Sequence, residues 1–554
     1  MVEKILNSKA KTITFATILI GGSTLISGLL GIVKMRLLAE RFDVGLILDS
    51  YFTAFRVPDL ISATIITGGI IVSFLPLFSQ HFQKDKEKAW DLTNNMLNIS
   101  LVALTVVCAT VWVFAPQLIN LIAPGFPEAQ KELTVSLTRI MFISPLIFAI
   151  SSIFSSVLHY FDRFVAYALA PILYNLGIIF GILFLSNLFE EHKMIYGVAW
   201  GVVMGSFLHL AIQIPSVISS GYRYQFRFNP RNSEFIKVLR LASLRMFSQA
   251  SSQINLMVIT AIASLLTAGS IAVFNFANNL YLFPVAIIGA SFATAAFPSF
   301  SRSMANGRLS EFVANFSSIF RQIIFVIVPL SVMILILRAQ VVRLVLGTGE
   351  FGWTETRLTA ATLGVFSFSM LFAALLPLVV RAFFAFQDTR TPALVTIISV
   401  ILNIFLSFFF VFLMNEGMFL YGVFSSIFKL TSIDDIRVVG LVIALSITTA
   451  LQLLVLLWFL GKKVQSLPFK EMGQSFVKIL TATIVMALAT YLALRVVVFF
   501  IHLTTFWAVF LQASFAFILG TATYLATLYL LDSSEIKAFW SATFGHFFRS
   551  TKKI

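Results

Sequence analysis

Long apolar stretches separated by short polar turns run along the whole chain. A helix needs about 20 mostly apolar residues to cross a bilayer, and on that scale the sequence predicts about fourteen membrane spans. Prolines inside the spans predict kinks at Pro58, Pro145, Pro284 and Pro377. The pattern indicates an all-α polytopic membrane protein. The spans are expected over residues 12–38, 47–79, 89–114, 130–158, 164–187, 194–219, 235–264, 269–300, 310–337, 357–384, 391–414, 437–461, 473–500 and 504–531.

Basic residues recur in every second connection between the predicted spans. Lysines precede the first span, and basic clusters follow at residues 84–88 and 223–240. The alternate connections, such as residues 187–193 and 430–437, contain fewer of them. By the positive-inside rule the sequence predicts that both termini are cytoplasmic. The first span is not followed by a small-residue cleavage site, so we expect a retained helix and not a signal peptide.

Composition narrows the class of protein further. Hydrophobic residues make up 59% of the 554 residues and charged residues 11%, whereas about 25% are charged in a soluble protein. A soluble surface cannot be built from so few charges, which excludes a cytosolic enzyme, a secreted disulfide scaffold and a disordered chain. The net charge of +15 is explained by basic residues in the predicted cytoplasmic connections, as the positive-inside rule requires. We therefore expect no nucleic-acid partner.

Motifs for bond-making chemistry are missing from the sequence. Cys108 is the one cysteine, the six histidines show no ligand spacing, and no glycine-rich phosphate loop is present for ATP. We therefore expect no catalytic residue, no metal and no cofactor, and the protein is not predicted to be an enzyme. A helical membrane protein without an ATPase motif indicates secondary transport.

Two halves of the sequence resemble each other at a separation of about 225 residues. Residues 116–126 match 339–351, and residues 158–175 match 383–403. A chance likeness of two apolar stretches is the alternative explanation, and the matched polar turns make it weaker. The shared landmarks are Gln117 with Gln340, Asp162 with Asp388, and Asn175 with Asn403.

The repeat predicts the domain organisation. An N-terminal lobe is expected over residues 1–222 and a C-terminal lobe over residues 223–462, each with six spans. An even number of spans gives both repeats the same orientation, so a pseudo-two-fold axis is expected near the membrane normal. Residues 463–554 would add two helices and a basic cytoplasmic tail.

Charged residues in the first two spans are candidates for function, because each costs about 2.5–3.5 kcal/mol at mid-bilayer. Lys34 and Arg56 are expected to lie deepest, and Asp49, Arg56 and Asp59 would share one helix face. One interpretation is a water-filled cationic cavity for an anionic headgroup. The other is an ion-pair cluster that only holds two helices together. For Arg56 with Asp49 both stay open, whereas Lys34 favours the cavity.

Amide and hydroxyl side chains are dense in the seventh and eighth spans. Hydrogen bonds between helices explain part of this density, and the rest would line a cavity between the two lobes. Gly31, Pro58 and Pro284 are the expected hinge or kink positions. The residues expected to bind substrate are Ser27, Lys34, Asp49, Arg56, Asp59, Ser248, Gln253, Asn255, Asn278 and Asn279.

Three stretches of the sequence resemble the MurJ (MviN) family of lipid II flippases, in the superfamily of multidrug, oligosaccharidyl-lipid and polysaccharide exporters. They are residues 27–60, 278–302 and 381–392, and the likeness extends over nearly the whole chain. The resemblance implies a monomeric flippase of the bacterial cytoplasmic membrane. Its anionic substrate would be a polyprenyl-diphosphate saccharide, namely the peptidoglycan precursor lipid II, moved to the outer leaflet by alternating access. Cell-wall synthesis proteins are the implied partners besides membrane lipid.

The sequence departs from the family pattern at several arginines. Three family arginines fall on Gly28, Ser62 and Asn279, and a fourth falls on Lys34. The resemblance implies that these arginines contact the lipid pyrophosphate, and a lysine cannot reproduce a bidentate guanidinium contact. Some members bind sodium through an acid on the seventh helix, but residues 241–265 contain none.

Two other functions stay open on the sequence alone. The chain could be a sister exporter, either a lipid-linked oligosaccharide flippase or a drug antiporter. It could also be a relative that scaffolds envelope proteins without transport. For the flippase, the sequence predicts that the membrane potential drives export, since no ATP-binding loop is present.

Overall fold

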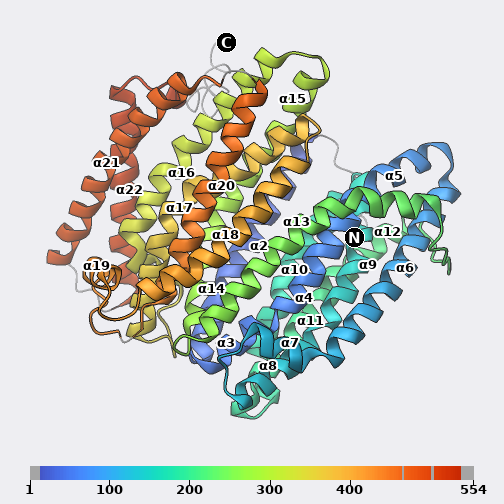
Figure 1. Cartoon of the computed structure of the whole chain (residues 1–554), viewed down its shortest axis with the longest axis horizontal. Helices are drawn as coiled ribbons and strands as arrows, with labels where there is room; N and C mark the ends of the chain where they lie inside the picture. Colours follow the sequence, from blue (N-terminus) through green and yellow to red (C-terminus); the bar gives the residue numbers. More distant parts are fainter. Residues whose placement is uncertain (1–12, 434, 465–466, 501–504, 538–554) are drawn as a thin grey trace, which may run out of the picture. The chain divides into compact units, whose positions relative to one another are not determined.

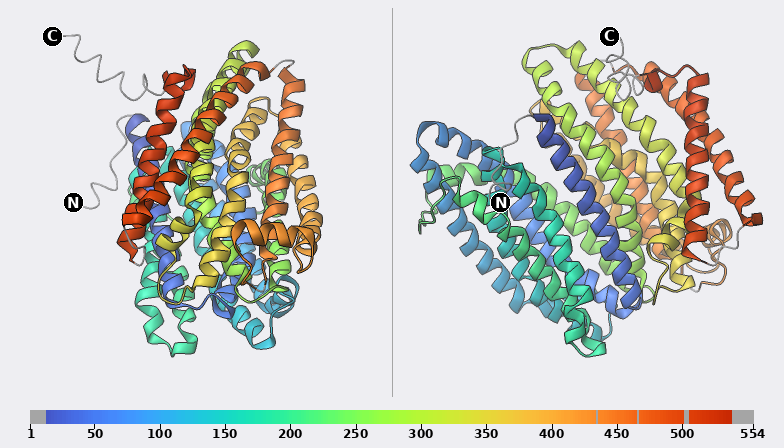
Figure 2. Two further views of the ribbon diagram at one scale, coloured as in Figure 1. Left: turned by 90° about the vertical axis from the view of Figure 1, so that its left-hand side faces the viewer. Right: turned by 180° about the vertical axis from the view of Figure 1, so that it is seen from behind.

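The computed structural model describes residues 13–433, 435–464, 467–500 and 505–537. These residues are mostly helical and contain no strand (Figure 1, Figure 2). Among them, 12 helices are long and apolar enough to cross a membrane. Two further helical stretches, residues 46–84 and 233–264, coincide with the second and seventh predicted spans. The prediction of an all-α membrane protein with about fourteen spans is confirmed.

The chain divides into two compact units. The first comprises Met1–Asn275 with Thr348–Gly352, and the second comprises Phe276–Gly347 with Trp353–Ile554. The lobe boundary at residue 222 came from a sequence repeat, which is a different property from spatial proximity, and it stays a prediction.

Elements of the first unit alternate long helices with short breaks. They are α2 (Ile13–Arg41), α3 (Leu46–Ala54), α4 (Arg56–Ile61), the π-helix η1 (Ser62–Ile70), α5 (Ile71–Lys84), α6 (Lys86–Val113), α7 (Ala115–Ile122), α8 (Glu128–Met141), α9 (Ile143–Tyr160), α10 (Phe164–Leu183), η2 (Leu185–Leu188), η3 (Glu191–Lys193), α11 (Ile195–Ala211), α12 (Ile214–Ile218) and α13 (Ser233–Ser264).

The remaining elements are α14, whose first turns belong to the first unit, and the helices of the second unit. They are α14 (Ser270–Val285), the π-helix η4 (Ala286–Ala290), α15 (Ser291–Ala305), α16 (Leu309–Val345), α17 (Trp353–Ala385), α18 (Arg390–Leu413), α19 (Phe419–Phe428), α20 (Val438–Val464), α21 (Phe469–Phe500) and α22 (Phe506–Leu530).

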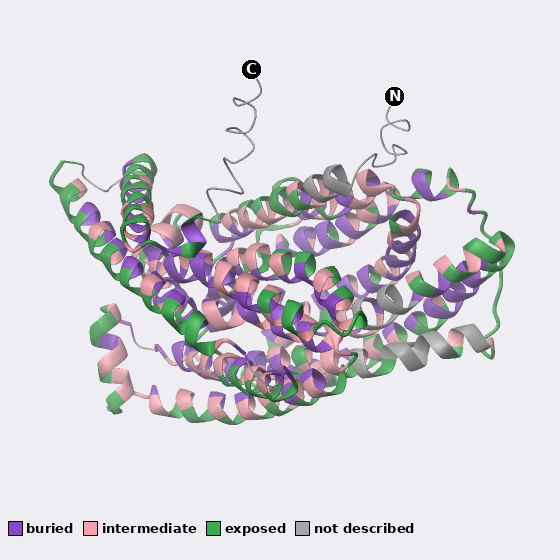
Figure 3. Cartoon of the chain, turned by 90° about the horizontal axis from the view of Figure 1, so that it is seen from above, coloured by how far each residue is buried: buried purple, intermediate pink, exposed green. Residues whose placement is uncertain are grey.

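Exposed residues recur along the faces of many helices, as Figure 3 shows. Several are large and apolar: Phe405 on α18 is 68% exposed and Ile518 on α22 is 66% exposed. In water such surfaces would favour aggregation, whereas in a bilayer the lipid chains cover them. These faces therefore suit contact with lipid.

Three of the four predicted proline kinks coincide with irregular helix. Pro58 lies between the break at Phe55 and the π-helix η1, Pro145 lies in the first turn of α9, and Pro284 immediately precedes the π-helix η4. Proline removes a backbone donor, and such positions commonly bend a helix. By contrast, α17 continues through Pro377 and α2 continues through Gly31 without a break. A hinge role for Gly31 stays a prediction.

Glycines bring α10 and α11 into close contact. A Cβ atom added at Gly177 would lie 2.3 Å from the Cα of Gly205, and one at Gly181 would lie 2.6 Å from the Cα of Gly201. Small residues four apart let membrane helices approach at backbone distance. This contact fixes α10, the helix that carries a buried amide against α2.

Three asparagines on α6 hold the segment before α13. The side-chain amides of Asn94, Asn98 and Asn95 donate to the backbone carbonyls of residues 223, 227 and 229 at 3.2, 2.9 and 3.1 Å. The amide oxygen of Asn95 accepts the Asn229 N–H in return at 2.6 Å. Backbone polar groups without a strand or helix of their own are thereby satisfied.

Matched helix ends support the internal repeat. Asp162 and Gln387 are left-handed, with φ of 57° and 58°. The next N–H in each turn donates to a carbonyl five residues back, from Arg163 to Leu158 and from residue 388 to residue 383, both at 3.0 Å. This is the Schellman end of a helix. The two turns are 225 residues apart, which pairs Asp162 with Gln387 rather than with Asp388.

The two aspartates of these turns have different roles. An Asp388 oxygen accepts the N–H groups of Arg390 and Thr391 at 3.1 and 3.0 Å, and this side chain thereby caps α18. Its other oxygen lies 2.6 Å from the Lys463 ammonium. Asp162 adopts the left-handed position that ends α9.

We predict that Asp388→Asn lowers the free energy of unfolding by about 1–2 kcal/mol at pH 7. Burial raises the pKa of Asp388, but hydrogen bonds from Lys463 and Thr391 outweigh it and lower this pKa to about 2. A depressed carboxyl pKa stabilises the folded state above the unfolded pKa of about 4, and this contribution is lost as the pH falls toward 2. Unfolding of both proteins at pH 7, 4 and 2.5 measures the difference; a gap that stays constant would contradict the prediction.

Candidate functional site

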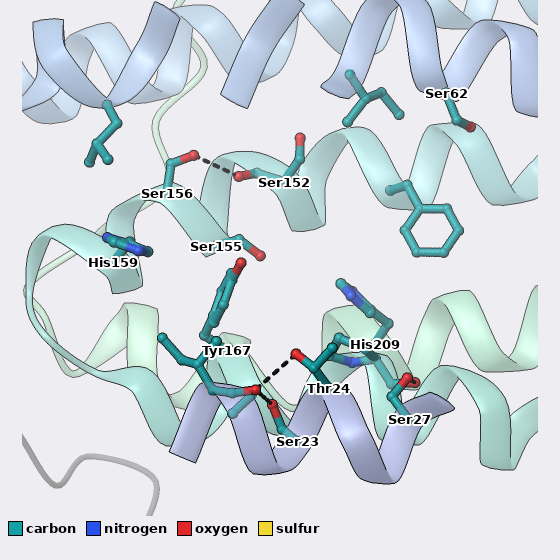
Figure 4. A pocket seen from close by; sticks show the side chains of 16 residues that line it. Ser23, Thr24, Ser27, Ser62, Ser152, Ser155, Ser156, His159, Tyr167 and His209 are labelled. Carbon is teal, nitrogen blue, oxygen red and sulfur yellow. Dashed lines mark hydrogen bonds between the residues drawn. The ribbon is translucent and has the colours of Figure 1, made fainter. Parts of the chain in front are cut away.

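A cavity of about 460 Å³ lies inside the first unit, between α2, η1, α5, α9, α10 and α11. Figure 4 shows hydroxyl and imidazole side chains around it. No lining residue is an acid, a lysine or an arginine, so the wall offers neutral hydrogen-bonding groups. The polar members are Ser23, Thr24, Ser27, Ser62, Ser152, Ser155, Ser156, His159, Tyr167 and His209.

Asn175 on α10 extends the polar wall of the cavity by contacting two residues of α2. Its side-chain amide donates to the Ser27 hydroxyl at 3.0 Å and to the Ser27 carbonyl at 3.2 Å. Its oxygen lies 3.5 Å from the Lys34 ammonium. Ser27 and Lys34 are seven residues apart and share a face of α2. The half-buried Lys34 is therefore turned toward α10 and the polar wall.

Arg56 is held by two neutral partners on α13 and α14. Its Nε donates to the Thr260 hydroxyl at 2.8 Å, and a terminal nitrogen donates to the Asn275 side-chain oxygen at 2.9 Å. The residue is 7% exposed. Since α13 packs against α4 and η1, residues more than two hundred positions apart meet here. The guanidinium keeps its charge without a carboxylate in direct contact.

Asp49 caps the helix α14. Its two carboxylate oxygens accept the N–H groups of Gly269 and Ala272 at 2.8 and 2.7 Å. A carboxylate at a helix N-terminus meets unpaired N–H groups and the positive end of the dipole. Gly269 has φ of 91°, and a Cβ atom there would lie 2.5 Å from the Val44 carbonyl. Only glycine fits this close turn.

Asp49 and Arg56 therefore have separate partners. The sequence predicted one helix face for Asp49, Arg56 and Asp59. This segment is divided at Phe55, between the end of α3 at Ala54 and the start of α4 at Arg56, and the shared face stays a prediction. Asp49 binds a helix end, and Arg56 binds a hydroxyl and an amide.

Asp59 is exposed although it lies well inside the second span. It is within electrostatic range of both Arg56 and Lys34. A lone carboxylate facing lipid is costly, so we expect Asp59 to contact water. Two basic groups and one acid then leave the local charge positive, because the charge of Asp49 is compensated by the end of α14.

The predicted residues of the seventh and eighth spans fall into two groups. On α13, Asn255 is buried, and Ser248 and Gln253 are half-buried in the first unit. On α14, Asn278 is half-buried and Asn279 is exposed, and both belong to the second unit. Their assignment to a substrate site stays a prediction, as does a cavity between the lobes.

Three residues of this network were not chosen from the sequence as site residues. Thr260 and Asn275 hold Arg56, and Asn175 was recognised only as a landmark of the repeat. A threonine inside an apolar span usually bonds to its own helix, as Thr260 also does with the Leu256 carbonyl. Its sequence context therefore gives no signal. Asn175 was visible as an amide in the middle of the fifth span.

The fold and the charged network are those of a multi-pass membrane transporter. A solved multidrug resistance MATE family transporter of the MOP superfamily, inward-facing, shares the fold with a TM-score of 0.62 at 14% identity, over 84% of this chain and 97% of that one. A solved lipid II flippase MurJ in an inward closed conformation matches with a TM-score of 0.74 at 23% identity, over 93% of this chain and 98% of that one.

Residues 38–511 match the family described as lipid II flippase MurJ, and the chain belongs to this family. A relative named probable lipid II flippase MurJ from Buchnera aphidicola subsp. Schizaphis graminum is 30% identical over 71% of this chain and 77% of its own length. A protein of the same name from Rhizobium meliloti is 28% identical over 71% of this chain and 74% of its own length.

We predict that Asp49→Ala destabilises the protein by about 1–3 kcal/mol, because two buried N–H groups at the start of α14 lose their acceptor. Asp49 is 2% exposed. The nearby Asp43 is exposed, so Asp43→Ala is the matched control and should change stability by less than about 0.5 kcal/mol. Thermal unfolding in detergent measures both. Equal stabilities for the two variants would contradict the capping role.

Proposed function

We propose that the protein is a flippase that moves lipid II from the inner to the outer leaflet of the bacterial cytoplasmic membrane. Membership of the family supports the substrate class. The observation that carries the proposal is the polar path in the first unit. It starts at the hydroxyl-lined cavity, continues through Asn175 to Lys34, and ends near Arg56 and Asp59.

The charge of the path suits a diphosphate headgroup. Lys34 and Arg56 provide positive charge inside the span, and Asp59 is the exposed acid beside them. Within the described part of the chain, neither basic residue forms an ion pair with a carboxylate. Lys34 contacts an amide, and Arg56 contacts an amide and a hydroxyl. Neutral partners leave the positive charge available to an incoming anion. An arginine with a carboxylate partner would first have to exchange it.

The hydroxyl-rich wall offers neutral donors in place of missing family arginines. Ser62 stands where the family has an arginine, and it lines the cavity, as Ser27 does. Serine hydroxyls donate and accept hydrogen bonds, so they can bind phosphate oxygens or sugar hydroxyls. Such contacts are weaker than bidentate guanidinium contacts. The headgroup would then be bound by one lysine, one arginine and several hydroxyls.

Transport in this proposal needs no ATP. A diphosphate carries about two negative charges, and each charge that crosses 100 mV is worth about 2.3 kcal/mol. With the cytoplasm negative, outward movement of the headgroup is favoured by several kcal/mol. The protein lowers the barrier, which for a bare ion in hydrocarbon is of the order of tens of kcal/mol. Alternating access would expose the headgroup to each side in turn, while the polyprenyl chain stays in lipid.

The proposed orientation places both termini in the cytoplasm. Basic residues in alternate connections support it. We also propose that the flippase acts as a monomer, with cell-wall synthesis proteins as partners in the membrane.

Complementation tests this function. We predict that the protein restores growth to a bacterium depleted of its own lipid II flippase, and that Arg56→Ala abolishes this rescue while Arg36→Ala retains most of it. Arg56 is buried beside Pro58, whereas Arg36 is half-buried on α2 with a path toward the outer interface. Both variants have to be present in the membrane at the wild-type level.

Two outcomes would contradict the proposal. Failure of the correctly inserted wild-type protein to restore growth would favour a sister exporter or a scaffold. Equal rescue by Arg56→Ala and Arg36→Ala would remove Arg56 from the substrate path.

A further inference from the structure

A second cavity, of about 340 Å³, lies inside the second unit between α16, α17, the end of α19 and α22. Four basic residues line it: Arg338, Arg343, Arg357 and Lys429. None of its lining residues, all of them within the described part of the chain, is acidic. A cavity that gathers cations without acids attracts anions.

Arg338 is positioned by its surroundings rather than by an acid. A terminal nitrogen donates to the Leu335 carbonyl at 2.8 Å, and the guanidinium lies 5.0 Å from the centre of the Phe428 ring. A Cβ atom at Gly364 on α17 would lie 2.9 Å from the Arg338 Cδ. The glycine therefore makes room for the arginine stem. One backbone acceptor leaves most of the five guanidinium donors for a ligand.

The other basic groups come from separate elements. Arg357 on α17 donates to the Ser432 hydroxyl at 2.7 Å. Lys429 is exposed and left-handed, with φ of 57°, at the end of α19. The helices α16 and α17 and the end of α19 thus each contribute positive charge to the same cavity.

The additional helix α22 completes the cavity wall. Gln512 donates to the Leu494 carbonyl at 3.0 Å and accepts from the Gln340 amide at 3.3 Å. These bonds join α22 to α21 and α16. Of the two helices beyond the internal repeat, α22 therefore supplies a wall of the basic cavity, and α21 holds α22 through the Leu494 carbonyl.

The cavity lies where lipid phosphates are expected. In the orientation of the proposed function, on which this step rests, the end of α16 and the starts of α17 and α22 face the outside. Trp353, at the start of α17, lines the cavity and is 66% exposed. Tryptophan favours the membrane–water interface, where the headgroups lie. Arginine binds phosphate bidentately and is suited to such a partner.

We propose that this cavity binds the phosphate group of an anionic lipid in the outer leaflet. The site is separate from the polar path of the first unit and takes no part in loading substrate from the cytoplasm. A bound headgroup would tie α16, α17 and α22 together. The phosphate could be carried by a glycerophospholipid or by a polyprenyl diphosphate, and the experiment distinguishes these sources.

Binding to the purified full-length protein tests the proposal. Phosphatidylglycerol, a polyprenyl diphosphate and inorganic phosphate are titrated separately, with native mass spectrometry or thermal stabilisation as the readout. The variant is Arg338→Gln with Arg357→Gln, which keeps part of each stem. The control is Arg495→Gln, since Arg495 is exposed at the end of α21 and bonds only its neighbour Tyr491 among the contacts described. Lys429→Gln replaces the double variant if that variant does not fold.

We expect the double variant to bind one of the two lipids at least about tenfold more weakly, as for loss of a charged hydrogen bond, and the control to bind it like the wild type. Loss for phosphatidylglycerol identifies a membrane phospholipid, and loss for the diphosphate identifies the transported class. Equal binding by the wild type and the variants would overturn the proposal, and so would binding of inorganic phosphate alone. None of these measurements needs flipping, so a failed growth rescue with intact lipid binding would contradict the proposed function only.

Discussion

A charged side chain within a membrane-spanning segment has to be given polar partners or water, and the first unit is arranged around this constraint. Arg56 receives a hydroxyl and an amide from α13 and α14, and Asp49 receives two backbone N–H groups at the start of α14. Both side chains are buried. The same two contacts join the second span to the seventh and eighth, so the charges that make the site also hold these helices together.

The choice of partners decides what the charges can do. Asp49 is paired with a helix end, which compensates its charge locally. Arg56 and Lys34 have neutral partners, which orient the groups without compensating them. The result is a positive region in which Asp59 is the exposed acid. The break beside Pro58 places irregular helix next to this region, where a change of conformation costs least.

Much of the fold could be predicted from the sequence, because membrane spans depend on long apolar runs and little else. Irregular helix could be expected at Pro58 and Pro284 because a proline inside a span is itself a local signal for a kink. The site was harder, since partners such as Thr260 lie two hundred residues away from Arg56 and bear no local signal. The break at Phe55 between α3 and α4 also had no local signal in the sequence. The left-handed Gln387, rather than an aspartate, marks the repeated turn because backbone geometry defines it.

We propose that the membrane potential drives the headgroup through the positive path, and lipid II translocation in proteoliposomes of defined orientation is the decisive measurement. A potassium gradient with valinomycin sets the potential, and the appearance of labelled headgroup at the outer face gives the rate. We expect a potential negative on the cytoplasmic side to accelerate outward movement, since two charges across 100 mV contribute about 4.6 kcal/mol. An unchanged rate when the potential is collapsed or reversed would contradict it.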